Sequence, residues 1–163
     1  MTFAHIDKVG ELDKIENPEA EVFNGLVTRL SIWKSAGELG IKELPFGTGA
    51  ADGKSALTRY YKETDQNFLH IFAFPAHNQF LDFLIKFGVI GFIGLCIYFV
   101  YIFKLGLRSG SIIAVVFFWI FFTSNLVDDF LIRYDGIVFA AFWLSIFASL
   151  SIAGRSGKLQ RDF

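Results

Sequence analysis

The stretch from Phe87 to Phe103, FGVIGFIGLCIYFVYIF, contains no charged residue. Two further uncharged stretches follow it, from Ser109 to Val127 and from Gly136 to Gly154. Each is close to the length of about 20 residues that an α-helix needs to cross the apolar core of a bilayer. Lys86 can extend its amine towards the membrane surface, so the first helix can begin near Phe83. The sequence therefore predicts three transmembrane helices, at about residues 83–103, 109–127 and 136–154.

The overall composition also indicates an all-α membrane protein. Of the 163 residues, 53% are hydrophobic and 21 are phenylalanine, and the mean hydropathy is +0.48. These values are too high for a small soluble domain. The formal net charge is -1 and no basic patch stands out, so we expect no nucleic-acid partner.

Basic residues are distributed unevenly around the predicted spans. They lie between the first two spans (Lys104 and Arg108) and after the third (Arg155, Lys158 and Arg161), whereas the loop between the second and third spans places Arg133 among three aspartates. The positive-inside rule puts the more basic segments in the cytoplasm. We therefore expect a multi-pass protein of the bacterial inner membrane, with residues 1–81 in the periplasm and the C-terminus in the cytoplasm.

The segment before the first span would have to be exported, but its first residues do not resemble a signal peptide. We therefore expect the chain to be the C-terminal part of a larger polytopic protein, completed by N-terminal transmembrane helices or by a companion subunit. The alternative is that Met1 is the true start and that the segment is exported without help.

Within residues 1–81, an amphipathic helix is predicted near residues 18–39. Asn17 can cap its N-terminus and Pro18 suits its first turn. Apolar residues then recur at three- and four-residue steps, and Arg29 lies beside this apolar face. In the first span, Gly88, Gly91 and Gly94 form a stripe of small residues that predicts close packing against another helix.

His77 and Asn78 directly precede the first apolar stretch. An imidazole has an ordinary pKa of about 6.5 and can act as a base near neutral pH. An ionisable group at a membrane boundary has to be hydrated, paired or used, so His77 is a candidate functional residue; the alternative is an interfacial histidine without a chemical role. His70 lies nearby without a cysteine or a third ligand at fixed spacing, so we expect no metal site.

Three sequence elements, in this order, resemble the C-terminal signature of the O-antigen ligase and O-antigen polymerase family. They are Arg29-x-x-x-Trp33, Pro45-Phe46-Gly47-x-Gly49, and His77-Asn78-x-x-Leu81 followed by Gly88 and Gly91 in a membrane helix. The resemblance covers about residues 22 to 150, and the last two spans agree with the family only in hydropathy.

The resemblance implies a glycosyltransferase of surface polysaccharide synthesis. Such enzymes take a glycan from undecaprenyl diphosphate on the periplasmic side of the membrane. A ligase passes it to a lipid A core sugar, and a polymerase passes it to another carrier-linked glycan. By resemblance, His77 is the essential histidine and acts as the base, and Arg29 binds the diphosphate of the carrier. The implied reaction uses no metal or cofactor and inverts the anomeric centre.

Two further residues are expected to contact substrate. Asn78 would orient His77 or the acceptor, and Arg59, which precedes two tyrosines, would contact phosphate or sugar. The chain also departs from the family pattern, because members carry more membrane helices before this region and a further periplasmic arginine. We therefore expect the chain alone to be incomplete and inactive. The competing hypothesis is a membrane interaction or scaffold subunit without catalytic activity.

Overall fold

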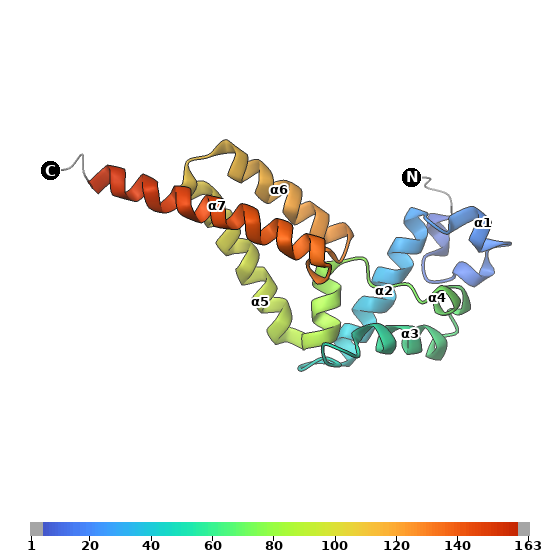
Figure 1. The fold of residues 1–163 in the computed structure, drawn as a ribbon. Helices are drawn as coiled ribbons and strands as arrows, with labels where there is room; N and C mark the ends of the chain where they lie inside the picture. Colours follow the sequence, from blue (N-terminus) through green and yellow to red (C-terminus); the bar gives the residue numbers. More distant parts are fainter. Residues whose placement is uncertain (1–4, 160–163) are drawn as a thin grey trace. The chain divides into compact units, whose positions relative to one another are not determined.

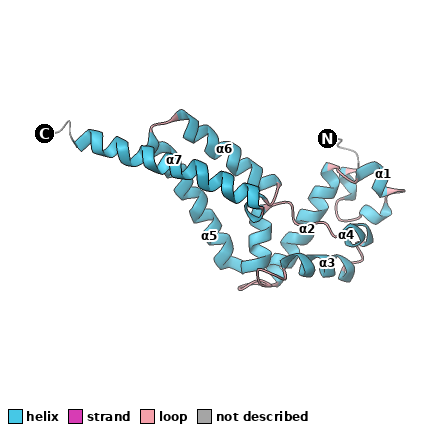
Figure 2. Ribbon diagram, in the orientation of Figure 1, coloured by secondary structure: helices cyan, strands magenta, loops and turns pink. Residues whose placement is uncertain are grey.

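The computed structural model describes residues 5–159, and side chains up to residue 153. All regular structure in this range is helical, and none of the described residues lies in a strand (Figure 2). This agrees with the predicted all-α class. The basic residues predicted for the cytoplasmic tail, Arg155, Lys158 and Arg161, lie outside the residues whose side chains are described.

The chain forms two compact units, Met1–Ile93 and Gly94–Phe163, and helix α5 (Gln79–Ser109) runs from the first into the second. The first unit also contains η1 (Ile6–Lys8), η2 (Leu12–Lys14), α1 (Pro18–Val22), α2 (Leu26–Lys42), α3 (Gly53–Glu63) and α4 (Asn67–Phe72). The second contains α6 (Ile112–Val127), η3 (Phe130–Ile132) and α7 (Tyr134–Leu159) (Figure 1).

The first unit is built around α2, which packs against α1 and α3. Its core is apolar and almost fully buried, with contributions from α2, α3, α4 and the start of α5: Val27, Ile32, Leu57, Leu69 and Ile85. Four phenylalanine rings, with centroids 4.9 to 6.3 Å apart, close one side of this core: Phe23, Phe68, Phe72 and Phe74. This core fixes the position of the segments that carry the candidate site.

The prediction of a single helix near residues 18–39 is wrong, because the structure has two helices there, α1 and α2. The helix ends after Val22, whose carbonyl oxygen accepts a hydrogen bond from the backbone N–H of Gly25 at 2.7 Å. The hydroxyl of Thr28 donates to the same carbonyl. Gly25 itself is extended, with ψ of 162°, so α2 begins in a new direction. The predicted start at Pro18 is confirmed, but the side chain of Asn17 makes no capping hydrogen bond.

Helix α5 is bent at Gly88, which has φ of 60° and ψ of -149° inside an otherwise helical segment (Figure 1). This backbone conformation is accessible almost only to glycine. The loop of residues 45–49 docks at the bend. Three backbone hydrogen bonds join the loop to α5: Thr48 N to Ile85 O at 2.8 Å, Gly49 N to Lys86 O at 2.9 Å, and Val89 N to Pro45 O at 3.0 Å. The loop therefore binds backbone groups that the bend removes from the hydrogen-bond pattern of the helix.

The bend gives the glycine stripe a different meaning from the predicted one. At Gly88 the space left by the missing side chain is filled by the backbone of Pro45 and Phe46, not by another helix. At Gly91 a Cβ atom would meet the side chain of Phe87, one turn earlier in α5. A Cβ atom at Gly94 would have no described neighbour within 4 Å. Two of the three glycines are therefore explained by the bend and its docked loop.

Replacing Gly88 by alanine should strongly destabilise the first unit. A side chain in this backbone region costs about 1–3 kcal/mol, and the new Cβ would clash with the Pro45 carbonyl oxygen. We expect a clear fall in the thermal unfolding midpoint of the detergent-solubilised protein. The matched control is Gly94→Ala, where the space is open and alanine favours the helix. Equal midpoints for the two variants would contradict this account of the bend.

The second unit has an aromatic core. The ring centroids of Phe99 and Phe122 are 5.3 Å apart and join α5 to α6, and those of Phe117 and Phe147, also 5.3 Å apart, join α6 to α7. Among the described residues, α5 and the part of α7 from Tyr134 to Ala153 are long and apolar enough to cross a membrane. Only 22% of the most apolar window in each is buried. Two of the three predicted spans therefore meet this criterion, and α6, with 16 residues, is shorter.

Candidate functional site

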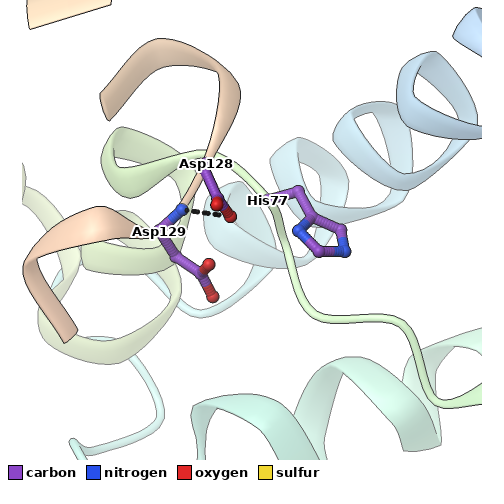
Figure 3. Close-up of side chains that lie close together, drawn as sticks. All are labelled: His77, Asp128 and Asp129. Carbon is purple, nitrogen blue, oxygen red and sulfur yellow. Dashed lines mark hydrogen bonds between the residues drawn. The ribbon is translucent and has the colours of Figure 1, made fainter. Parts of the chain in front are cut away.

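His77 lies in a short loop, residues 73–78, which connects α4 to α5 within the first unit and which we call the His77 loop (Figure 3). Two aromatic side chains from other helices hold this loop by its backbone carbonyls. The phenol of Tyr61 on α3 donates to the carbonyl oxygen of Phe74 at 3.2 Å. The indole Nε1–H of Trp33 on α2 donates to the carbonyl oxygen of His77, also at 3.2 Å. The loop is therefore tied to the helical core at both ends.

The backbone of His77 adopts a left-handed conformation, with φ of 45°. For a residue with a side chain this conformation is unfavourable by about 1–2 kcal/mol, so it needs support from its surroundings. The hydrogen bond from Trp33 supplies part of this support. The side chain of His77 is partly buried.

Asn78 caps the N-terminus of α5. Its side-chain Oδ1 accepts hydrogen bonds from the backbone N–H groups of Phe80 at 3.0 Å and Leu81 at 3.1 Å. Its own carbonyl accepts from the N–H of Asp82 at 2.9 Å, which starts the helical hydrogen-bond pattern. We did not predict this structural role from the sequence, although an asparagine directly before an apolar helix is a typical capping signal.

Arg29 lies on α2, one helical turn before Trp33. Residues four apart in a helix share a face, and four residues rise only about 6 Å along the axis. Trp33 reaches the His77 loop through its indole N–H, so Arg29 belongs to the helix face that contacts this loop. The side chains of Arg29 and Trp33 are both partly buried. The structure thus brings two sequence elements, Arg29-x-x-x-Trp33 and His77-Asn78, into one region of one unit.

Arg59 lies on α3 and is exposed. Its Nε is 3.8 Å from Oε1 of Glu63, an ion pair on the protein surface. It also lines an open groove of about 540 Å³, together with Lys54, Lys62 and His70. The groove is thus lined by several cationic side chains and is suited to an anionic group.

The two tyrosines that follow Arg59 have structural contacts. The hydroxyl of Tyr60 donates to Oε2 of Glu38 at 3.0 Å, and burial and this carboxylate raise the pKa of Tyr60 above its ordinary value. Burial raises the pKa of Tyr61, whose hydroxyl holds the His77 loop. Both phenols therefore remain protonated donors at neutral pH.

In the second unit, the loop between α6 and α7 contains a small ionic cluster. Figure 3 shows the backbone N–H of Asp129 donating to Oδ1 of Asp128, at 3.0 Å. Nη2 of Arg133 lies 3.1 Å from Oδ1 of Asp128 and 3.3 Å from Oδ1 of Asp129. Burial, and then the neighbouring Asp128, raise the pKa of Asp129. The basic residue of this loop is therefore engaged by its own acidic neighbours.

A family model described as O-antigen ligase matches residues 2–96 of the chain. No curated protein and no solved structure matches it. The matched range covers more than half of the chain and contains Arg29, Trp33, the loop at the bend of α5, and His77.

Proposed function

The chain belongs to the O-antigen ligase family, and on this basis we propose that it is part of a membrane glycosyltransferase that moves a glycan from undecaprenyl diphosphate to an acceptor hydroxyl. The acceptor is either a lipid A core sugar or another carrier-linked glycan. The observation that carries this proposal is the hydrogen bond from Trp33, on the helix of Arg29, to the carbonyl of His77. It links the helix that carries Arg29 to the loop that carries His77, the two residues to which we assign the chemistry.

In the proposed reaction, the imidazole of His77 removes the proton from the acceptor hydroxyl. The acceptor oxygen attacks the anomeric carbon while the bond from that carbon to the diphosphate oxygen breaks. This displacement inverts the anomeric centre. The leaving diphosphate gains negative charge, which the guanidinium of Arg29 stabilises through paired N–H donors. The proton held by His77 is then released to solvent or to the diphosphate.

Two residues would act on substrate in supporting roles. Asn78 is adjacent to His77 and fixes the start of α5 through its cap, which favours a role in orienting the histidine or the acceptor. Arg59 is exposed beside Lys54 and Lys62 in the groove on α3, where it can contact phosphate or sugar. In this proposal the side chains of Asn78 and Arg59 both contact the substrate.

We also propose the membrane arrangement. Helices α5, α6 and α7 cross the inner membrane, residues 1–81 lie in the periplasm, and the C-terminus lies in the cytoplasm. The apolar lengths of α5 and α7 support two crossings. Helix α6 has 16 residues and spans about 24 Å at 1.5 Å per residue, which is short for a bilayer core of about 30 Å, so the residues that flank it would lie at the membrane surface.

Deleting the gene in its native host tests the proposed function. We expect the surface glycan to be lost or shortened, and glycan linked to undecaprenyl diphosphate to accumulate, with both effects reversed by the full-length protein. A ligase defect leaves the lipid A core bare and the carrier-linked polymer long. A polymerase defect leaves single repeat units. A deletion strain with normal surface glycan and no accumulated carrier would contradict the proposal.

A further inference from the structure

The hydrogen bond between Trp33 and His77 connects residues 44 positions apart in the sequence. Its donor is the indole N–H, and its acceptor is the backbone carbonyl of the residue that we place at the reaction centre. The ring of Trp33 also packs against the buried core of the first unit. The position of the donor is therefore set by the core, and the position of the His77 carbonyl follows from it.

The hydrogen bond from Trp33 restrains a residue whose backbone conformation is unusual. With φ of 45°, the residue is in a region that side-chain-bearing residues rarely adopt. Rotation of the backbone towards a common region would swing the imidazole to a different direction. Asn78 fixes the chain on the other side of His77 by capping α5. The carbonyl of His77 is thus held between two anchored elements.

From this geometry we propose that Trp33 is a positioning residue, which sets the direction of the His77 imidazole relative to Arg29 through its N–H. The inference rests on the proposed function, because it assigns Trp33 a role in the reaction that His77 performs. Arg29 and Trp33 share a face of α2. Helix α2 therefore carries both the guanidinium of Arg29 and the indole N–H that aligns His77. A change in the spacing of these two residues would move the imidazole away from its position relative to the guanidinium.

The simplest alternative is that Trp33 only fills space in the core. The variant Trp33→Phe separates the two roles, because it keeps an aromatic ring and removes the N–H donor. We expect kcat for glycan transfer to fall about tenfold with KM little changed, since small displacements of a reacting group lower the rate more than binding. The assay uses the full-length protein in native membrane vesicles with glycan linked to undecaprenyl diphosphate.

Tyr61→Phe is the matched control. It removes one aromatic donor from the same loop, but at Phe74, three residues before His77. We expect this variant to keep kcat within about twofold, with a fall in thermal midpoint similar to that of Trp33→Phe. If both variants lose kcat in proportion to their loss of stability, Trp33 acts only on the fold and the inference is overturned.

A second variant, Trp33→His, restores an N–H donor on a smaller ring. A higher kcat than that of Trp33→Phe supports the inference, and an equal or lower kcat overturns it. The kcat values of the Trp33 variants are compared with that of His77→Asn. If His77→Asn is inactive and Trp33→Phe has wild-type kcat, the inference fails and the proposed function stands. If His77→Asn is fully active, the proposed function itself fails.

Discussion

Replacement of His77 by asparagine should reduce glycan transfer by about 10²- to 10⁴-fold, the usual contribution of a general base. Asparagine cannot take the proton of the acceptor hydroxyl, but it tolerates the left-handed backbone that His77 adopts. The hydrogen bond from Trp33 is to the backbone carbonyl and survives the change. The loss should therefore appear in kcat, with the thermal midpoint close to that of the wild type. The measurement is transfer of labelled glycan in membrane vesicles.

His70 provides the control for this experiment. It lies on α4 in the same unit, and its Nδ1 is 3.1 Å from the carbonyl oxygen of Thr58. His70→Asn removes a partly buried imidazole outside the His77 loop; because His70 also lines the groove of Arg59, we expect any effect to appear in KM, with kcat close to the wild-type value. A His77→Asn protein that restores normal surface glycan in the deletion strain would contradict the role of His77 as base.

The sequence predicts the long elements of the fold well, because they depend on local hydropathy. The three apolar runs coincide with α5, α6 and α7, although α5 begins four residues before and ends six residues after the predicted range of 83–103. The turn residues from Pro45 to Gly49 also appear as a loop. Local signals such as these act within one segment, so they can be recognised without knowing what the segment contacts.

The features that the sequence does not predict depend on contacts between distant segments. The glycines of α5 form a pattern typical of helix packing, and only the docked loop shows that Gly88 is a bend. The division between α1 and α2 is an exception, because its signal is local: Asn24-Gly25 is a typical turn dipeptide, and the hydroxyl of Thr28 donates to the carbonyl of Val22 across the turn.

The candidate site shows the same limit. Arg29 and His77 can be selected from their order and neighbours in the sequence, but nothing in that order shows that they lie in one region. The link between the two segments depends on Trp33, which the sequence offers as part of the Arg29-x-x-x-Trp33 element but without any sign of its hydrogen bond to His77. Candidate site residues can therefore be chosen from the sequence, whereas their arrangement depends on the packing of α2 against the His77 loop.

Replacing Arg29 tests whether the site stabilises a leaving diphosphate. We expect Arg29→Ala to lower kcat by about 10²- to 10³-fold, comparable to the loss of one strong donor to a developing negative charge. Arg29→Lys should recover only part of this loss. Lysine keeps the charge but lacks the planar pair of donors that matches two phosphate oxygens. The effect should fall mainly on kcat, because the charge on the diphosphate increases in the transition state.

Lys34 on the same helix gives a matched control. It is exposed, it carries the same charge as Arg29, and its amine lies near Gly10, away from the His77 loop. Lys34→Ala should keep transfer within about twofold of wild type at equal ionic strength, which excludes a general effect of net charge. If Arg29→Lys equals the wild type, charge alone suffices and the paired donors have no role. If Arg29→Ala and Lys34→Ala both equal the wild type, the diphosphate is bound elsewhere, and Arg59 in its cationic groove becomes the next residue to replace.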